Sequence, residues 1–264
     1  MSMKIYQVDS FTDKPFAGNP AGVCLMTEQR DANWMLAVAR EMNVAETAFL
    51  QKAEDGYQLR WFSPEVEIDL CGHATLASAH ILWQEGELKK NVEARFHTKS
   101  GLLTAQLLAE EWIQLNFPAT PPAPSPAPEK LNEILGAAAI YVGRSKFDLL
   151  VEVDSENTVR SLKPDFDALR NFDVRGVIVT ARATTKPFDF VSRFFGPAVG
   201  INEDPATGSS HCCLAPYWSG KLNKDSLLAY QCSSRSGVLR VTNEGERVLL
   251  EGKATTVIKG ELLA

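Results

Sequence analysis

Apolar and polar residues alternate along much of the chain, and this period of two predicts β-strands. In the first half, the pattern predicts strands at Lys4–Val8, Ala21–Met26, Glu46–Gln51, Tyr57–Phe62, Val92–Thr98, Leu102–Leu108 and Trp112–Phe117. In the second half, it predicts strands at Ala139–Val142, Phe147–Val153, Gly176–Ala183, Phe188–Phe195, Leu227–Cys232, Val238–Thr242, Arg247–Glu251 and Thr255–Leu263. Strands therefore dominate both halves.

In two segments, the residue pattern predicts a helix that is buried on every face. One runs from Gly72 to about Gln84 and the other begins near Gly208, and both are lined by small and apolar residues all the way round. Pro216 lies within the second helix, where we expect a kink. Further helices are predicted near Lys130–Leu135, near Pro164–Asn171 and after Asp31, which can cap an amphipathic helix. In each half, strands therefore curl around one buried helix.

A proline-rich segment separates the two halves. It places six prolines in the twelve residues from Phe117 to Pro128, which excludes a helix or a central strand and favours an extended spacer. We predict an N-terminal domain at residues 1–117, a linker at 118–128 and a C-terminal domain at 129–252. Residues 253–264 are predicted to form a terminal strand that can return to the N-terminal domain.

Composition and charge argue against several classes of partner. The chain has 264 residues, of which 45% are hydrophobic and 23% charged, as in ordinary globular proteins. Its net charge of −6 and its lack of Lys/Arg clusters argue against nucleic acid or an anionic membrane as a partner. No apolar run reaches the length of a membrane span, and no signal peptide precedes the first strand. Five cysteines without a pairing pattern are typical of a cytoplasmic protein.

Two related motifs stand at the starts of the buried helices. They read DLCGHAT at residues 69–75 and DPATGSS at residues 204–210. The first turn of a helix has unpaired N–H groups and partial positive charge, and glycine lets a ligand approach the backbone. Two such helix starts that face one another would bind a small carboxylate from both sides. The alternative for each motif is an ordinary helix cap.

Glu46 is the candidate acid/base in the first half. It begins an apolar strand just after a helix ends, so we expect its carboxylate at the rim of the domain. A surface glutamate at the start of a strand is the alternative. The turn-rich loop from Ser10 to Pro20 contains Asn19, which we expect to line the same site.

The thiol of Cys71 suggests two other kinds of chemistry, catalysis by a thiol base and metal binding. Next to a helix start, its thiol could act as a base with a pKa lowered by the helix dipole. A racemase with two thiols would need a second cysteine where this chain has Thr207, so chemistry with two thiols is excluded. A zinc site built from Cys71, His73, His211 and Cys212 lacks the usual ligand spacing, and we expect no metal.

Several separated motifs in this order resemble the phenazine-biosynthesis PhzF-like isomerase family, which is distantly allied to diaminopimelate epimerases and proline racemases. The matching stretches are Val8–Thr12, Gly18–Val23, Asn43–Phe49, Cys71–Ala74 and Arg193–Ser210. The resemblance therefore covers essentially the whole chain.

This resemblance implies an α+β fold of two similar domains. Each is a β-barrel-like curled sheet around a central buried helix, as in diaminopimelate epimerase, with the active site in the interdomain cleft. It also implies an enzyme that needs no cofactor and no metal, and that forms a homodimer. By motif match, Glu46 resembles the family's catalytic acid/base, His73 and Asp204 its flanking polar residues, and Gly72, Gly208 and Ser209 its carboxylate-binding positions.

The sequence therefore predicts a cofactor-independent isomerase that moves a proton between carbons of a small carboxylic acid. Glu46 would act alone as the base that removes and returns the proton, while His73 and Asp204 orient the substrate. One alternative is an epimerase or racemase that uses Cys71 with a partner other than a thiol. The other is a protein that binds small acids without catalysis.

Overall fold

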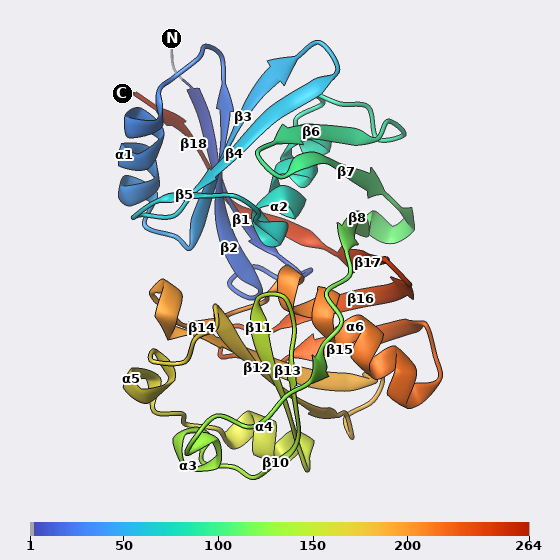
Figure 1. Ribbon diagram of the computed structural model, residues 1–264. Coiled ribbons are helices and arrows are strands. Elements are labelled where there is room, and N and C mark those ends of the chain that lie inside the picture. The colour runs from blue at the N-terminus through green and yellow to red at the C-terminus, as the bar shows by residue number, and fades with distance from the viewer. Residues whose placement is uncertain (1–2, 264) are drawn as a thin grey trace. The chain divides into compact units, whose positions relative to one another are not determined.

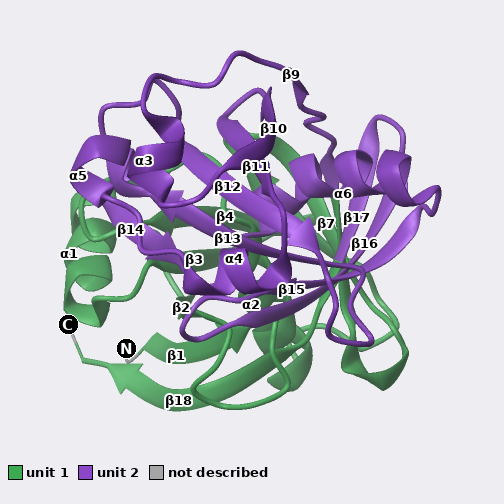
Figure 2. Ribbon diagram, turned by 90° about the horizontal axis from the view of Figure 1, so that it is seen from below, with its two compact units in different colours: residues 1–116, 251–264 green, residues 117–250 purple. Residues whose placement is uncertain are grey.

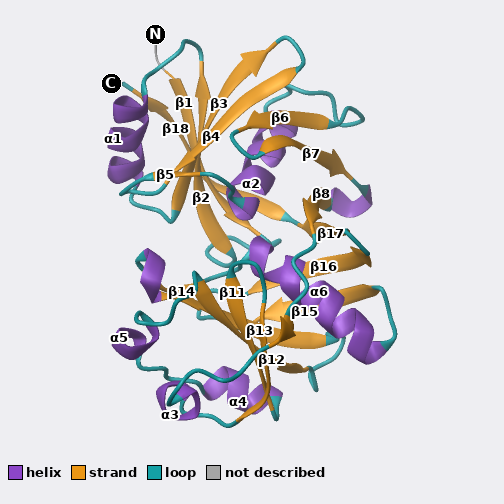
Figure 3. Ribbon diagram, viewed as in Figure 1, coloured by secondary structure: helices purple, strands orange, loops and turns teal. Residues whose placement is uncertain are grey.

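The computed structural model describes residues 3–263, and the chain forms two compact units (Figures 1 and 2). Unit 1 consists of residues 1–116 and 251–264, and unit 2 of residues 117–250. Each unit contains more strands than helices, and the helices lie between strands in the sequence (Figure 3).

Unit 1 is built on a sheet whose strands follow the order β18-β1-β2-β3-β4-β6-β7-β8. The strands are β1 (Met3–Ser10), β2 (Asn19–Met26), β3 (Glu46–Ala53), β4 (Gly56–Phe62), β5 (Glu67–Ile68), β6 (Ala94–Thr98), β7 (Gly101–Leu107), β8 (Ile113–Pro118) and β18 (Ala254–Leu262). The pairs β2–β3 and β4–β6 are parallel, and the other pairs are antiparallel. The short strand β5 pairs with the end of β4.

Two helices of unit 1 make the crossovers that its parallel strand pairs require. Helix α1 (Ala32–Met42) joins β2 to β3 and packs on the sheet with Met35 and Val38 against Phe49 and Phe62. Helix α2 (Gly72–Gln84) joins β4 and β5 to β6 and lies against β1, β2, β3 and β18. All its residues from 73 to 83 except His80 are buried, so the sheet encloses α2 as its sequence predicts.

Unit 2 repeats this topology. Its strands are β9 (Ala123–Pro124), β10 (Ala139–Arg144), β11 (Asp148–Val153), β12 (Gly176–Arg182), β13 (Phe190–Gly196), β14 (Ile201–Asp204), β15 (Ser226–Gln231), β16 (Gly237–Glu244) and β17 (Arg247–Gly252), which ends in unit 1. Its helices are α3 (Leu131–Leu135), α4 (Glu156–Ser161), α5 (Phe166–Leu169) and α6 (Gly208–Leu222). The parallel pairs β11–β12 and β13–β15 are again connected through helices. Helices α4 and α5 join β11 to β12, and α6 lies between β13 and β15 in the chain.

The predicted elements are confirmed in most places, with differences confined to short elements. Helix α4 was not predicted, and the helix expected at Pro164–Asn171 is the single turn α5, because segments this short have no clear helical period. Strand β14 was not predicted, and it pairs with β13 through Asp204 and Phe194. The proline-rich residues lie along unit 2, where β9 pairs with β10.

Pro216 lies within α6, and the helix continues past it to Leu222. A proline inside a helix leaves the carbonyl four residues earlier without its helical donor. That carbonyl belongs to Cys212, and the backbone N–H of Thr120 donates to it at 3.0 Å. The proline-rich segment therefore satisfies the carbonyl that Pro216 leaves open.

Within residues 3–263, none of the helices combines the length and the apolar character that crossing a membrane requires.

Candidate active site

The start of α2 in unit 1 gathers the first group of predicted residues. Glu46 is the first residue of β3 and pairs with Ala21 of the parallel strand β2. Asn19 begins β2, so both side chains belong to the same end of the sheet. His73 is the second residue of α2, directly after Gly72. The sheet register and the helix start together bring side chains from three elements to one place.

The imidazole of His73 is the centre of this group. Its Nε2 lies 3.2 Å from the Glu46 carboxylate, and its Nδ1 lies 3.3 Å from Asn19 Nδ2 and 3.6 Å from the Cys71 sulfur. The side chains of His73 and Glu46 are 7% and 12% exposed. Among residues 3–263, no acceptor is aligned with His73 Nε2 as in a good hydrogen bond, so the contact with Glu46 is an ion pair. The structure therefore supports the expected proximity of Glu46, His73 and Asn19.

Burial and acidic neighbours act in opposite directions on His73. Burial disfavours the imidazolium, but the neighbouring Cys71 and Glu46 favour it more strongly, and the pKa of His73 lies well above its ordinary value. For Cys71, burial raises the pKa of the thiol although His73 opposes this effect. The expectation that the helix dipole lowers the pKa of Cys71 is therefore wrong, because desolvation outweighs the dipole.

Two residues that the sequence did not single out hold this group in place. The hydroxyl of Ser10, at the end of β1, donates to the backbone carbonyl of His73 at 2.8 Å. The neighbouring Asp9 is 1% exposed and accepts a hydrogen bond from the backbone N–H of Phe16 at 2.7 Å. Both lie in β1, the strand next to β2, and in the stretch Val8–Thr12 that resembles the family, but no local pattern assigned a role to either residue.

Within the described part of the chain, the side chains of Glu46, Cys71 and His73 form the group that could hold a metal ion. The ligand atoms of Glu46, Cys71 and His73 lie within 4.8 Å of one another. A thiol must lose its proton to bind zinc, and the raised pKa of Cys71 opposes that loss. The site is therefore better suited to proton transfer than to metal binding.

The start of α6 in unit 2 holds the second group of predicted residues. Asp204 ends β14 and is 7% exposed, and the hydroxyl of Thr207 donates to its carboxylate. Gln231, which the sequence did not single out, is fully buried at the end of β15. Its side-chain oxygen accepts from the N–H of Thr207 at 2.9 Å, and its amide donates to the Asp204 carbonyl at 2.7 Å. Gln231 thus fixes the turn that leads into Gly208 and Ser209.

The helices differ in how they begin, and α3 starts at Lys130 without a side-chain cap. Asp31, Ser155 and Asp165 cap α1, α4 and α5 by accepting from backbone N–H groups through their side chains. Within the described residues, the N-cap side chains of α2 and α6, Cys71 and Thr207, make no such bond. N–H groups at a helix start that lack a cap are free to bind an anion. Both helix starts therefore lack the ordinary side-chain cap that was the alternative for each motif.

Two arginines of unit 2 are engaged with carboxylates. Arg193 donates to both oxygens of Glu203 at 2.6 and 2.9 Å. Arg175 was not predicted, and it donates to Ser209 Oγ at 3.0 Å while it pairs with the buried Asp148. Sequence reasoning missed Arg175 because it lies 34 residues before Ser209, and no local pattern connects the two.

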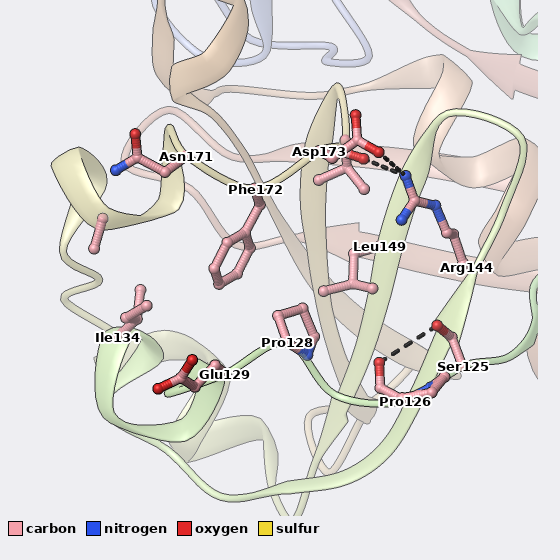
Figure 4. Close-up of a pocket in the computed structure, with 12 residues that line it drawn as sticks. Ser125, Pro126, Pro128, Glu129, Ile134, Arg144, Leu149, Asn171, Phe172 and Asp173 are labelled. Carbon is pink, nitrogen blue, oxygen red and sulfur yellow. Dashed lines mark hydrogen bonds and ion pairs between the residues drawn. The ribbon is translucent and has the colours of Figure 1, made fainter.

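A separate cavity of about 540 Å³ lies elsewhere in unit 2, between the proline-rich segment, α3 and α5 (Figure 4). Pro128, Leu149 and Phe172 form part of its wall. At its edge, Arg144 donates to the carboxylate of Asp173 at 3.2 Å. None of the predicted site residues lines the cavity.

His211 gives unit 2 a measurable sensitivity to acid. It is fully buried, its Nδ1 donates to the carbonyl of Thr207 at 2.8 Å, and burial lowers its pKa from 6.5 to about 4. The unfolded chain takes up this proton near pH 6.5 and the folded chain only near pH 4. The free energy of unfolding should therefore fall by about 3 kcal/mol between these values and then level off.

Urea unfolding between pH 7 and pH 4 measures this effect. The control is His211→Asn, whose amide N–H can replace the donor to the Thr207 carbonyl but does not titrate. The difference in stability between the two proteins should shrink as the pH falls. Parallel curves for the two proteins would contradict the assignment to His211.

Comparison with known proteins places the chain in a family. A family model described as phenazine biosynthesis-like protein matches residues 8–260. The chain belongs to this family. An uncharacterized isomerase of Halalkalibacterium halodurans is 52% identical over 264 residues, covering 100% of this chain and 99% of the relative. The crystal structure of a phenazine biosynthesis protein of the PhzF family from Enterococcus faecalis is 40% identical, with a TM-score of 0.95 and coverage of 100% of both chains.

These similarities confirm the predicted family and the predicted enzyme class. The phenazine biosynthesis-like chain is an isomerase, and its fold is the α+β, diaminopimelate epimerase-like fold. A hydroxyproline epimerase from Agrobacterium vitis, solved with trans-4-hydroxy-L-proline, has a TM-score of 0.65 at 11% identity, covering 99% of this chain and 92% of the epimerase. At that identity the likeness extends to the fold alone.

Proposed function

We propose that this chain moves a proton between carbons of a small carboxylic acid, with Glu46 as the base. The observation that carries the proposal is the buried pair of Glu46 and His73. The Glu46 carboxylate oxygen and His73 Nε2 lie 3.2 Å apart, at a helix start that has no side-chain cap. Glu46 removes a proton from a carbon activated by the neighbouring carboxylate. It then returns the proton to another carbon on the same face of the substrate.

His73 supports this chemistry by its charge. Its raised pKa favours the imidazolium form, whose positive charge stabilises negative charge that develops on the substrate. The N–H groups at the start of α2, which begins with Gly72, bind the same anion. These donors are fixed before the substrate arrives, because Ser10 and the sheet hold the helix start.

For the motif of unit 2, we propose a role in binding a carboxylate. Gly208 and Ser209 bind the substrate carboxylate through their N–H groups and the Ser209 hydroxyl, and Asp204 orients the substrate. The support for this part is the uncapped start of α6 and the buried bonds of Gln231 that hold the preceding turn.

Exchange of substrate hydrogens with solvent deuterium tests the function. If Glu46 removes a proton from carbon, that position of the substrate acid should exchange its hydrogen for solvent deuterium. NMR detects the exchange as the loss of one proton signal. The panel consists of amino, hydroxy and unsaturated carboxylic acids, and it includes trans-4-hydroxy-L-proline, the ligand of the hydroxyproline epimerase that shares the fold. Acids that bind without exchange would identify a binding protein and refute the isomerase mechanism.

One observation favours a second candidate, an epimerase that uses Cys71. The Cys71 sulfur lies 3.6 Å from His73 Nδ1, close enough for the positive charge of His73 to stabilise a thiolate. The raised pKa of the thiol favours Glu46 instead, because a buried neutral thiol is a poor base.

The variant Cys71→Ser separates the two candidates. We expect it to retain exchange within about threefold of the wild type, because general-base catalysis by Glu46 does not need the thiol. The measurement is the initial rate of deuterium incorporation at saturating acid. A loss of a hundredfold or more would transfer the role of the base to Cys71.

A further inference from the structure

Arg175 occupies a fixed place beside the start of α6. It precedes β12, and its backbone N–H donates to the carbonyl of Phe147 at 2.9 Å. The guanidinium carbon lies 5.3 Å from the ring centre of Phe147 and 5.4 Å from that of Phe194. Two aromatic rings therefore restrict the guanidinium group while its side chain remains 32% exposed.

Asp148 fixes the orientation of this guanidinium. Arg175 Nε donates to Asp148 Oδ1 at 2.8 Å, and Nη2 donates to Oδ2 at 2.5 Å. The Asp148 side chain is 2% exposed, and burial raises the pKa of this carboxyl although Arg175 opposes the effect. A bidentate pair of this kind sets the plane of the guanidinium as well as its position.

The remaining nitrogen, Nη1, donates to Ser209 Oγ at 3.0 Å. Arginine has donors only, so Ser209 must be the acceptor in this contact. The hydroxyl has a single proton, and the contact with Arg175 leaves that proton free to be donated elsewhere. Among the described residues, no protein acceptor for it is recorded.

We propose that Arg175 is a positioning residue for Ser209, holding its hydroxyl so that the proton is donated to the carboxylate of the bound acid. The inference rests on the proposed function, since it takes Ser209 as a substrate-binding residue. Asp148 then acts through Arg175 and has no contact of its own with the acid. Arg175 thereby raises the affinity of the site for carboxylates over their neutral amides.

A double-mutant cycle with Ser209→Ala and Arg175→Gln tests the proposal. The readouts are kcat and KM for deuterium exchange into an acid that the wild type accepts. Each single variant should raise KM about tenfold and leave kcat within about threefold, as expected for the loss of a charge-assisted hydrogen bond. The double variant should be no worse than Ser209→Ala, because Arg175 acts only through that hydroxyl. Additive losses would show an independent role for Arg175 and overturn the proposal.

Arg160→Gln is the matched control. Arg160 also donates two hydrogen bonds to a buried carboxylate, that of Glu156, and also lies over an aromatic ring, that of Tyr230. Within residues 3–263, it makes no hydrogen bond or ion pair with a residue of the candidate site. Its loss should lower the stability of unit 2 and leave KM unchanged, which separates a general effect on folding from an effect on Ser209.

Calorimetric titration with benzoate and its neutral analogue benzamide separates this proposal from the proposed function. It uses the same variants and needs no turnover. Arg175→Gln should weaken benzoate binding about tenfold, by the same reasoning as for KM, and leave benzamide binding unchanged. If the wild type binds benzoate with this dependence but exchanges no acid, the isomerase mechanism fails and the role of Arg175 stands. If benzoate binds equally to both proteins, or to neither, the role of Arg175 is refuted.

Discussion

Replacement of Glu46 by glutamine is expected to lower the rate of deuterium exchange by about 10³-fold. Glutamine has nearly the same shape as glutamate, but its amide cannot accept a proton from carbon near neutral pH. The change also removes the ion pair with His73, whose Nε2 lies 3.2 Å from the carboxylate. Without Glu46, the pKa of His73 should fall toward its ordinary value, which NMR titration of the imidazole can follow.

Glu67→Gln is the control for this prediction. Glu67 is also a partly buried glutamate of unit 1 in an ion pair, with Arg60 at 2.7 Å and Lys99 at 2.6 Å. In the described part of the chain, its side chain pairs with Arg60 and Lys99 and makes no hydrogen bond or ion pair with His73, so its loss should leave exchange at the wild-type rate. The binding of the acid by Glu46→Gln should stay within about threefold of the wild type, since general-base catalysis acts on the reaction step. Exchange by Glu46→Gln within tenfold of the wild type would refute its role as the base.

Replacement of Gly18 by alanine should cause the largest loss of stability near the site. Gly18 has a φ of +63°, and a Cβ there would overlap the carbonyl oxygen of Ser10 and lie 2.8 Å from Thr12 Cγ2. The left-handed backbone and the steric clash together should cost about 3 kcal/mol. Because the hydroxyl of Ser10 holds the carbonyl of His73, exchange should fall as well.

Urea unfolding measures this loss, with Gly86→Ala as the control. Gly86 also has a positive φ, of +72°, but a Cβ there would meet nothing within 4 Å. Its replacement should cost only about 1 kcal/mol, from the backbone conformation alone. Equal losses for the two variants would show that the contact with Ser10 does not contribute.

Much of unit 1 could be predicted because its elements have strong local signals. Helix α2 spans the predicted residues from Gly72 to Gln84, and Asp31 caps α1 by accepting from the N–H of Trp34. Both signals are local, since a helical period and a cap depend on residues within a few positions of one another. The start of β3 at Glu46 was predicted for the same reason.

The elements and residues that were missed depend on partners far away in the chain. Strand β14 exists because Asp204 pairs with Phe194, and its four residues have no period that would identify a strand. The buried Gln231 is a polar residue at the end of an apolar strand, and only its bonds to Thr207 reveal its role. Arg175 was missed for the same reason, because its partners are set by the packing of unit 2.

The sequence by itself determined the family, the α+β class and the two helix starts where the chemistry is expected. Periodicity, helix signals and the order of the motifs can be read from the sequence without knowledge of the tertiary structure. Only the tertiary structure decided that Glu46 meets His73 and that Cys71 is a buried thiol with a raised pKa. Ion pairs and desolvation depend on groups that folding brings together from distant positions, so no single stretch of sequence contains them.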